Sequence, residues 1–101
     1  MYDPNMKFYK YNGWHISEYM MQAIHRYVQF GIRPGDFLYN VLCNNFCEAV
    51  FHADRENKCN LPAYAHFLVE CMPAESFGSI ENVESWINSG GLNGQQNEKL
   101  N

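Results

Sequence analysis

The sequence predicts an all-α fold, a compact single domain of three to five short helices. Three observations favour this class. Apolar residues recur at intervals of three and four along most of the chain, which is the period of a helix with one buried face. Residues that typically cap helices stand at the ends of these periodic segments. Threonine is absent and valine is sparse, so the β-branched residues typical of strands are scarce.

Composition and charge restrict the class of protein. The 101 residues are 47% hydrophobic and 18% charged, which indicates one globular domain rather than a disordered chain. The net charge of −4 argues against binding to bulk nucleic acid or to an anionic membrane, because both need a basic surface. No apolar run reaches the length of about 18 residues that a membrane span needs. The N-terminus lacks the basic-then-apolar order of a secretory signal, so we expect a cytosolic protein.

The chain divides into three predicted parts. Residues 1–15 form an aromatic N-terminal arm that we expect to lie on the body, with Phe8 and Trp14 as its anchors. Residues 16–89 form the helical domain. Residues 90–101 show no periodicity and offer little to bury, so they are predicted to be a flexible, disordered tail.

The first two helices follow from caps and breakers. Ser17 is a good N-cap for a helix that extends to residue 30, and Gly31 ends that helix. A turn with two glycines and a proline follows, and Asp36 is predicted to cap a second helix over residues 37–53. A break is expected within this helix at Asn44 and Asn45, which are poor helix formers.

Two further helices complete the predicted body. One begins after Asn60, with Pro62 in its first turn, and ends before Pro73. The other is short, is capped by Ser79 and ends at Gly90.

The four cysteines have two interpretations. Without an export signal they are expected to be reduced and buried as small hydrophobic residues. The alternative is a zinc site, in which Cys43 and Cys47 lie one helical turn apart and His52, His66 and Cys71 complete the ligand set. No Cys-x-x-Cys pair is present, so we predict neither a metal nor another cofactor.

A resemblance to a known group can be stated on residues between Trp14 and Ile87. Over these residues the chain resembles the short, mostly uncharacterised accessory proteins that tailed phages and prophages encode. The resemblance is carried by Arg26-Tyr27-Val28, Gly31-Ile32, Pro34-Gly35, Phe37-Leu38, Val41-Leu42, Asn44, Glu48-Ala49, Ala53-Asp54, Glu56-Asn57, Leu61-Pro62-Ala63-Tyr64, Phe67-Leu68, Pro73, Gly78-Ser79, Val83 and Trp86-Ile87. Phe77 and Phe46 stand where the pattern usually has Trp and Leu. The resemblance implies a viral accessory protein in the host cell cytoplasm, and it implies no catalytic residues.

The residues themselves also favour a protein that is not an enzyme. The four histidines are scattered, and the sequence has no nucleophile elbow, P-loop or dinucleotide-binding fingerprint. Asp54 and Glu56 are two residues apart at a predicted helix end, so their side chains diverge and do not form an acid–base couple.

The candidate ligand-binding residues surround the turn from Arg33 to Asp36. Arg33 offers a guanidinium group suited to phosphate, and Arg26 lies at the end of the preceding helix, within reach of the same turn. Tyr27 and Tyr39 are predicted to stack on a base. The alternative is a structural turn with an exposed arginine, where the carboxylate of Asp36 repels an anion.

The aromatic content indicates association. Phe, Trp and Tyr make up 16% of the chain, and seven residues are tyrosines. A helical body of this size has too small an interior for all of them. Surplus tyrosine on a surface is typical of an interface, so we predict a homodimer or a higher oligomer. Tyrosines half-buried around the rim of an ordinary core are the alternative.

The resemblance and these residues leave three functional hypotheses. In the first, the protein is an anti-defence sponge that sequesters a nucleotide immune signal of the host, of the cyclic nucleotide or ADP-ribose type. In the second, it blocks a host defence protein, such as a CRISPR effector. In the third, it is a phage regulatory or structural accessory protein. A pocket with convergent Arg and Tyr would serve the first, and a flat tyrosine-rich face would serve the second.

Overall fold

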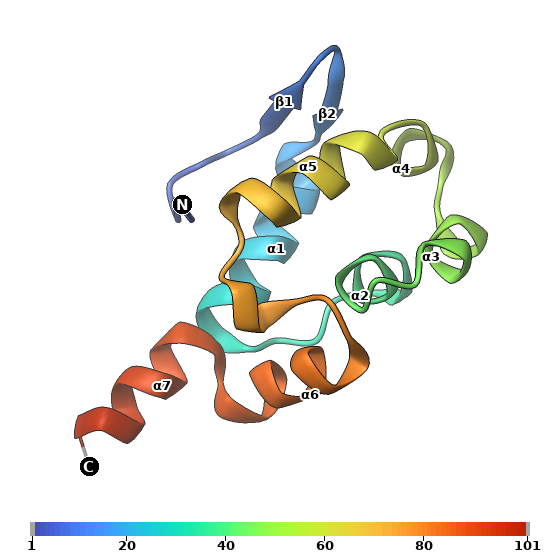
Figure 1. The fold of residues 1–101 in the computed structure, drawn as a ribbon. Coiled ribbons are helices and arrows are strands. Elements are labelled where there is room, and N and C mark those ends of the chain that lie inside the picture. Colours follow the sequence, from blue (N-terminus) through green and yellow to red (C-terminus); the bar gives the residue numbers. More distant parts are fainter. Residues whose placement is uncertain (1, 101) are drawn as a thin grey trace.

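A computed structural model describes residues 2–100 of the chain, with side chains through residue 95. The predicted all-α class is confirmed, although the described part contains seven helices rather than three to five. The number is larger because the predicted helix over residues 37–53 is broken and residues 55–59 and 91–100 form helices of their own. In chain order the elements are β1 (Tyr9–Tyr11), β2 (Trp14–Ile16), α1 (Glu18–Phe30), α2 (Asp36–Leu42), α3 (Phe46–His52), α4 (Arg55–Cys59), α5 (Leu61–Cys71), a 3₁₀ turn (Ala74–Ser76), α6 (Ile80–Ser89) and α7 (Gly91–Leu100), as Figure 1 shows.

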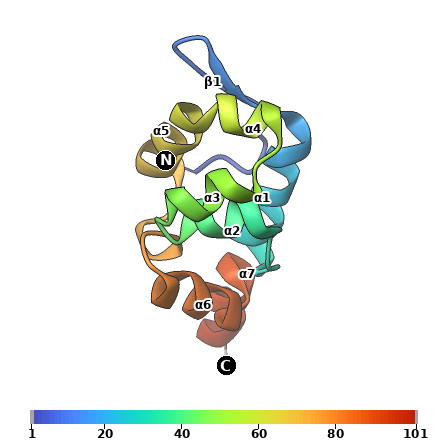
Figure 2. The ribbon, with the colours of Figure 1, turned by 90° about the vertical axis from the view of Figure 1, so that its right-hand side faces the viewer.

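The N-terminal arm contains a β-hairpin that the sequence analysis did not predict. β1 and β2 are antiparallel, with Tyr9 opposite Ile16 and Tyr11 opposite Trp14. The turn between them is Asn12-Gly13, and both residues have positive φ, 49° and 86°. Two-residue turns of this kind need positive φ at both positions, which Asn and Gly adopt most readily. The hairpin packs on α5, and its tip projects beyond the helices at one end of the molecule (Figure 2).

The anchors predicted for the arm are wrong. Phe8 is 55% exposed and Trp14 is 38% exposed, whereas Ile16 is completely buried. Side chains alternate along a strand, so Phe8 falls on the opposite face from Tyr9, whose ring meets Phe67 of α5 edge-on at a centroid distance of 5.1 Å. Trp14 lies beside the hairpin turn.

The predicted limits of α1 are confirmed. The Ser17 hydroxyl accepts a hydrogen bond from the backbone N–H of Met20 at 3.3 Å, which satisfies one of the unpaired amides of the first turn. Gly31 ends the helix in the left-handed conformation, with φ of 68°. The Pro62, Ser79 and Gly90 predictions are also confirmed at the ends of α5 and α6.

The predicted break in the second helix is confirmed, and its predicted cap is wrong. Asn44 has φ of 63° between α2 and α3, a conformation that Asn tolerates better than most residues. The N-cap of α2 is Gly35 rather than Asp36, which is the first residue inside the helix. α2 therefore begins one residue earlier than a cap at the Asp36 carboxylate predicts, directly after the proline–glycine turn.

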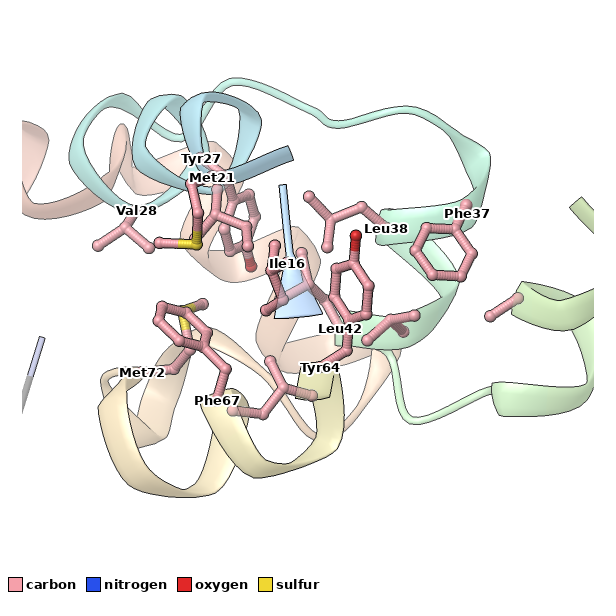
Figure 3. Close-up of a cluster of buried hydrophobic side chains, with 14 of the residues drawn as sticks. Ile16, Met21, Tyr27, Val28, Phe37, Leu38, Leu42, Tyr64, Phe67 and Met72 are labelled. Atoms are coloured by element: carbon pink, nitrogen blue, oxygen red, sulfur yellow. The ribbon is translucent and has the colours of Figure 1, made fainter. Parts of the chain in front are cut away.

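One hydrophobic core joins the hairpin to α1, α2, α5 and α6 (Figure 3). The close-up shows side chains from the hairpin, α1, α2 and α5 converging, among them those of Ile16, Met21, Tyr27, Leu38, Leu42, Tyr64 and Phe67. Trp86 of α6 is also part of the core. Burial of apolar surface on this scale is the dominant favourable contribution to the stability of a small domain.

The prediction of a disordered tail is wrong for its first turns. α7 follows α6 directly and packs against α1. Gly91 lies so close to α1 that a Cβ there would be 2.6 Å from the Val28 carbonyl oxygen, and Leu92 packs against the core. The left-handed cap at Gly90 turns the chain, so that the start of α7 lies against the end of α1. Residue 101 of the predicted tail and Met1 of the predicted arm lie outside the described residues.

Within residues 2–100, the helices are all too short or too polar to cross a membrane.

Candidate functional site

A cleft of about 560 Å³ lies beside the turn at which the sequence analysis places a ligand. Its walls come from α1, the turn between α1 and α2, the start of α2, and the region from the end of α3 to α4. The residues lining it are Tyr19, Met20, Ala23, Arg26, Ile32, Arg33, Pro34, Gly35, Asp36, Phe37, Leu38, His52, Asp54 and Asn57.

The turn keeps its shape through local backbone chemistry. The N–H of Gly31 donates to the carbonyl oxygen of Tyr27 at 2.9 Å, and the N–H of Ile32 donates to the carbonyl oxygen of Arg26 at 3.4 Å. Pro34 restricts the backbone just before Gly35 begins α2. The turn is therefore tied to the last turn of α1, and the residues on it have little freedom to move away from the cleft.

Arg33 is held by residues from two other helices. Its Nη1 atom donates to Oε2 of Glu84 at 2.7 Å, and Glu84 belongs to α6. Its guanidinium group lies over the ring of Tyr39, 4.3 Å from the ring centroid. Because the fork has five N–H donors, binding to one carboxylate oxygen leaves others available to a ligand. Arg33 is thus a positioned cation at the edge of the cleft.

Tyr39 contacts Arg33 and does not line the cleft. Its hydroxyl donates to the same Oε2 atom of Glu84 at 2.5 Å. This hydrogen bond to the carboxylate, together with burial, raises the pKa of Tyr39 to about 12. Tyr39 is not among the residues that line the cleft, and one face of its ring is covered by Arg33. The expectation that Tyr39 stacks on a base is replaced by a role in holding the arginine.

Arg26 lies on the same cleft as Arg33, as its position at the end of α1 suggests. The side chain is exposed. Among the side chains that the structure describes, no carboxylate forms an ion pair with Arg26. Its guanidinium group is therefore available to an anion.

Tyr27 cannot stack on a ligand, so this prediction is wrong. The side chain is fully buried in the core, and its hydroxyl donates to the backbone carbonyl of Ser76 at 2.6 Å. Burial raises the pKa of Tyr27 well above its usual range. The helical period explains the position, because Tyr27 follows Ile24 by three residues on the buried face of α1.

Acidic groups also line the cleft. Asp36 is exposed at the start of α2, and Asp54 is exposed at the N-cap of α4, where its Oδ1 accepts from the N–H of Asn57 at 2.8 Å. His52 lies 3.7 Å from Glu48 on the same helix. The cleft therefore presents both cations and anions.

The sequence analysis missed Tyr19 and Glu84. Tyr19 lies on α1 away from its buried face, is 74% exposed, and offers an aromatic ring to the cleft. A signal for Tyr19 exists in the helical period, which places an aromatic residue off the apolar face. Glu84 is 51 residues from Arg33 in sequence, and no local pattern connects the two.

Three of the histidines attach the N-terminal segment to the body. His25 binds the Tyr2 hydroxyl through Nδ1 and the Met6 carbonyl through Nε2, the latter at 2.6 Å. His66 binds the Tyr9 hydroxyl at 2.5 Å, and His15 lies 3.1 Å from Glu56. Over residues 2–95, no group of three or more His, Cys, Asp or Glu side chains is placed to hold a metal ion.

All four cysteines are free thiols. Cys43 and Cys71 are half-buried, and burial raises the pKa of both thiols, which keeps them protonated and weakly nucleophilic at neutral pH. Cys47 and Cys59 are exposed, so the prediction of buried cysteines is wrong for these two. They lie on the outer faces of short helices, where the apolar neighbours in sequence point elsewhere.

Comparison of the chain with protein-family models, with curated proteins and with solved structures gives no match. The resemblance to phage accessory proteins therefore stays a prediction.

Proposed function

We propose that the chain is a non-enzymatic binding protein that takes a small, phosphate-bearing nucleotide into the cleft beside the turn before α2. The observation that carries the proposal is the presence of Arg26 and Arg33 on one cleft of about 560 Å³. A cleft of this volume falls within the range of about 300–1,000 Å³ that is typical of small-molecule sites.

The two arginines supply complementary properties. Arg26 has no ion-pair partner among the described side chains, so its charge is available. Arg33 is already ordered by Tyr39 and Glu84, so little conformational entropy is lost when it binds. Guanidinium groups suit phosphate oxygens because they can donate two parallel hydrogen bonds.

The remaining lining suits a nucleoside. The exposed ring of Tyr19 can stack on a base, a contact that contributes about 1–3 kcal/mol in nucleic-acid binders. The carboxylates of Asp36 and Asp54 can accept hydrogen bonds from ribose hydroxyls or base amino groups.

In its biological setting, the proposed protein is a phage-encoded anti-defence sponge in the host cytoplasm. Sequestration of a nucleotide immune signal requires affinity and abundance but no catalytic group. The resemblance to phage accessory proteins and the arginine-lined cleft together support this role.

A thermal-shift screen against cyclic mono-, di- and trinucleotides and ADP-ribose tests the proposal. A ligand at 100 times its Kd stabilises the folded state by about 2.7 kcal/mol, which raises the melting temperature of a domain of this size by about 10–20 °C. We expect Arg26→Ala to abolish the shift without changing the melting temperature of the free protein. Arg55→Ala is the matched control, because Arg55 is an exposed arginine of α4 that does not line the cleft. A full shift in Arg26→Ala, or no shift with any nucleotide, contradicts the proposal.

A second candidate function is inhibition of a host defence protein by direct contact. Phe51 is 84% exposed and Val69 is 76% exposed, and such side chains favour protein contact. Val69 borders an apolar groove of about 250 Å³ with Val41, Phe46 and Phe77. Phage plating on a defended host separates the two functions. Loss of protection in Phe51→Ser and Val69→Ser, with protection retained in Arg26→Ala, favours the protein target.

A further inference from the structure

The charges of the cleft restrict which phosphate it can take. Arg26 and Arg33 are its two fixed cations, and Asp36 and Asp54 are two anions on the same lining. His52 also lines the cleft, but it faces Glu48 across 3.7 Å, so a charge on this imidazole is balanced within its own pair. The lining by itself is therefore close to neutral.

When Glu84 is included, the net charge around the cleft becomes negative. Its Oε2 atom lies 2.7 Å from Nη1 of Arg33, so the carboxylate cancels much of the field of that guanidinium group. Glu84 is held there by the Tyr39 hydroxyl as well. Two positive charges are thus opposed by three negative ones, and Arg26 is the only cation of the cleft without an ion pair among the described side chains.

Phosphate esters differ in the charge they bring. A phosphodiester carries one negative charge at neutral pH, whereas a terminal phosphomonoester has a second pKa near 6 and carries almost two. One unpaired guanidinium group can balance the first charge. A second charge would meet the repulsion of Asp36 and Asp54 without a second free cation, because Glu84 already occupies Arg33.

We infer that the cleft takes nucleotides whose phosphate is a phosphodiester, such as cyclic nucleotides, and discriminates against nucleotides that end in a phosphomonoester. The inference rests on the proposed function and specifies its class of ligand. The same carboxylates that repel a second phosphate charge accept hydrogen bonds from the hydroxyl and amino groups of the nucleoside.

Isothermal titration calorimetry with two matched pairs of probes tests the inference. Cyclic AMP is compared with AMP, and cyclic di-AMP with linear pApA, so that the bases are the same and only the ester differs. Near pH 7.5 we expect the cyclic member of each pair that binds to have a Kd lower by about tenfold or more, since the second charge of a monoester is present there. Equal or tighter binding of the linear members overturns the inference and leaves the proposed function intact. If none of the four probes binds, the inference fails, and the wider thermal-shift screen then decides the proposed function separately.

The pH dependence of the ratio between the Kd values of the linear and the cyclic member of a pair is a second readout. At about pH 5 a monoester has lost most of its second charge. The ratio of the two Kd values is expected to approach one. The comparison is made in His52→Asn as well as in the unsubstituted protein, so that a change of charge on this imidazole cannot account for the shift in the ratio. A ratio that is unchanged between the two pH values contradicts the inference.

Charge-neutralising variants provide the third readout. Glu84→Gln removes one negative charge and keeps an amide oxygen for Arg33 and Tyr39, so AMP should gain more affinity than cyclic AMP. Asp36→Asn makes the same test at a side chain that forms no ion pair within the described residues. Glu75→Gln, at an exposed glutamate of the 3₁₀ turn, is the control and should leave the ratio unchanged. An unchanged ratio in both test variants, with melting temperatures close to that of the unsubstituted protein, overturns the inference.

Discussion

The indole Nε1 of Trp86 donates a hydrogen bond of 3.0 Å to the backbone carbonyl oxygen of Tyr27, and both side chains are buried. The Tyr27 hydroxyl in turn donates to the Ser76 carbonyl at 2.6 Å. The first bond connects α6, the helix that carries Glu84, to α1. The second connects α1 to the 3₁₀ turn. Through them the core determines where the carboxylate that holds Arg33 can lie.

We expect Trp86→Phe to destabilise the fold by about 1–3 kcal/mol, because it removes a buried hydrogen bond and leaves unfilled volume. The Tyr27 carbonyl keeps its second donor, the N–H of Gly31 at 2.9 Å, which limits the loss. Chemical denaturation followed by far-ultraviolet circular dichroism measures the change. Trp14→Phe, at the exposed tip of the hairpin, is the control and should cost less than about 0.5 kcal/mol. Equal effects of the two substitutions would contradict the structure.

Two glycines of the same turn should respond in opposite directions. Gly31→Ala is expected to cost more than about 1 kcal/mol, because φ is +68° and the new Cβ would lie 2.9 Å from the Ile87 carbonyl oxygen. Gly35 has φ of −65°, has open space around it and forms no side-chain cap for α2. Gly35→Ser should therefore stabilise the fold by about 0.5–1 kcal/mol. Melting temperatures of both variants check the pair, and a gain in Gly31→Ala is the outcome that does not fit.

Stability should fall at high pH partly through Tyr39. The hydrogen bond to Glu84 raises the pKa of Tyr39 from 10.0 to about 12, so the folded state holds this proton more tightly than the unfolded state. The stabilisation is complete below about pH 10 and is lost as pH rises toward the folded value. Tyr39→Phe removes this contribution, and the denaturation midpoint should then decline less steeply between about pH 10 and pH 12. Parallel profiles for the two proteins would show that the phenol is not coupled to folding.

We also expect the chain to associate with itself. Phe51 is 84% exposed, and the exposed Val69 borders the apolar groove that Phe46 and Phe77 also line, a gathering of apolar side chains that favours an interface. Light scattering at high micromolar concentration should give a mass above that of the monomer. Phe51→Ser should lower it, while Ile80→Ser, a substitution at an exposed residue in the first turn of α6, should not. A monomeric mass for the unsubstituted protein would contradict self-association and leave these side chains to another partner.

Much of the helical architecture follows from short-range chemistry. The residues that begin or end the helices act on backbone groups within a few residues of themselves, so their effects can be predicted from the sequence. They are Ser17, Gly31, Pro62, Ser79 and Gly90. The hairpin was predictable by the same logic, because Asn12-Gly13 between aromatic residues is a strong turn signal. The aromatic residues of this segment show no helical period, which by itself indicates only an irregular arm and hides the turn signal.

The candidate site was only partly predictable. Arg26 and Arg33 flank a single turn, and seven residues of chain cannot carry them far apart. Tyr27 belongs to the same stretch, and the apolar period of α1 already places it on the buried face with Ile24 and Val28, so its burial was predictable as well.

The sequence by itself determined the helical class, most helix ends and the position of the turn beside the cleft, because caps, breakers and apolar periods act locally. Only the tertiary structure decided that Glu84 holds Arg33 and that Asp54 shares a cleft with Arg26. These relationships join residues separated by tens of positions. They depend on how the helices pack, and packing is decided by the shape and burial of the whole core rather than by any one segment.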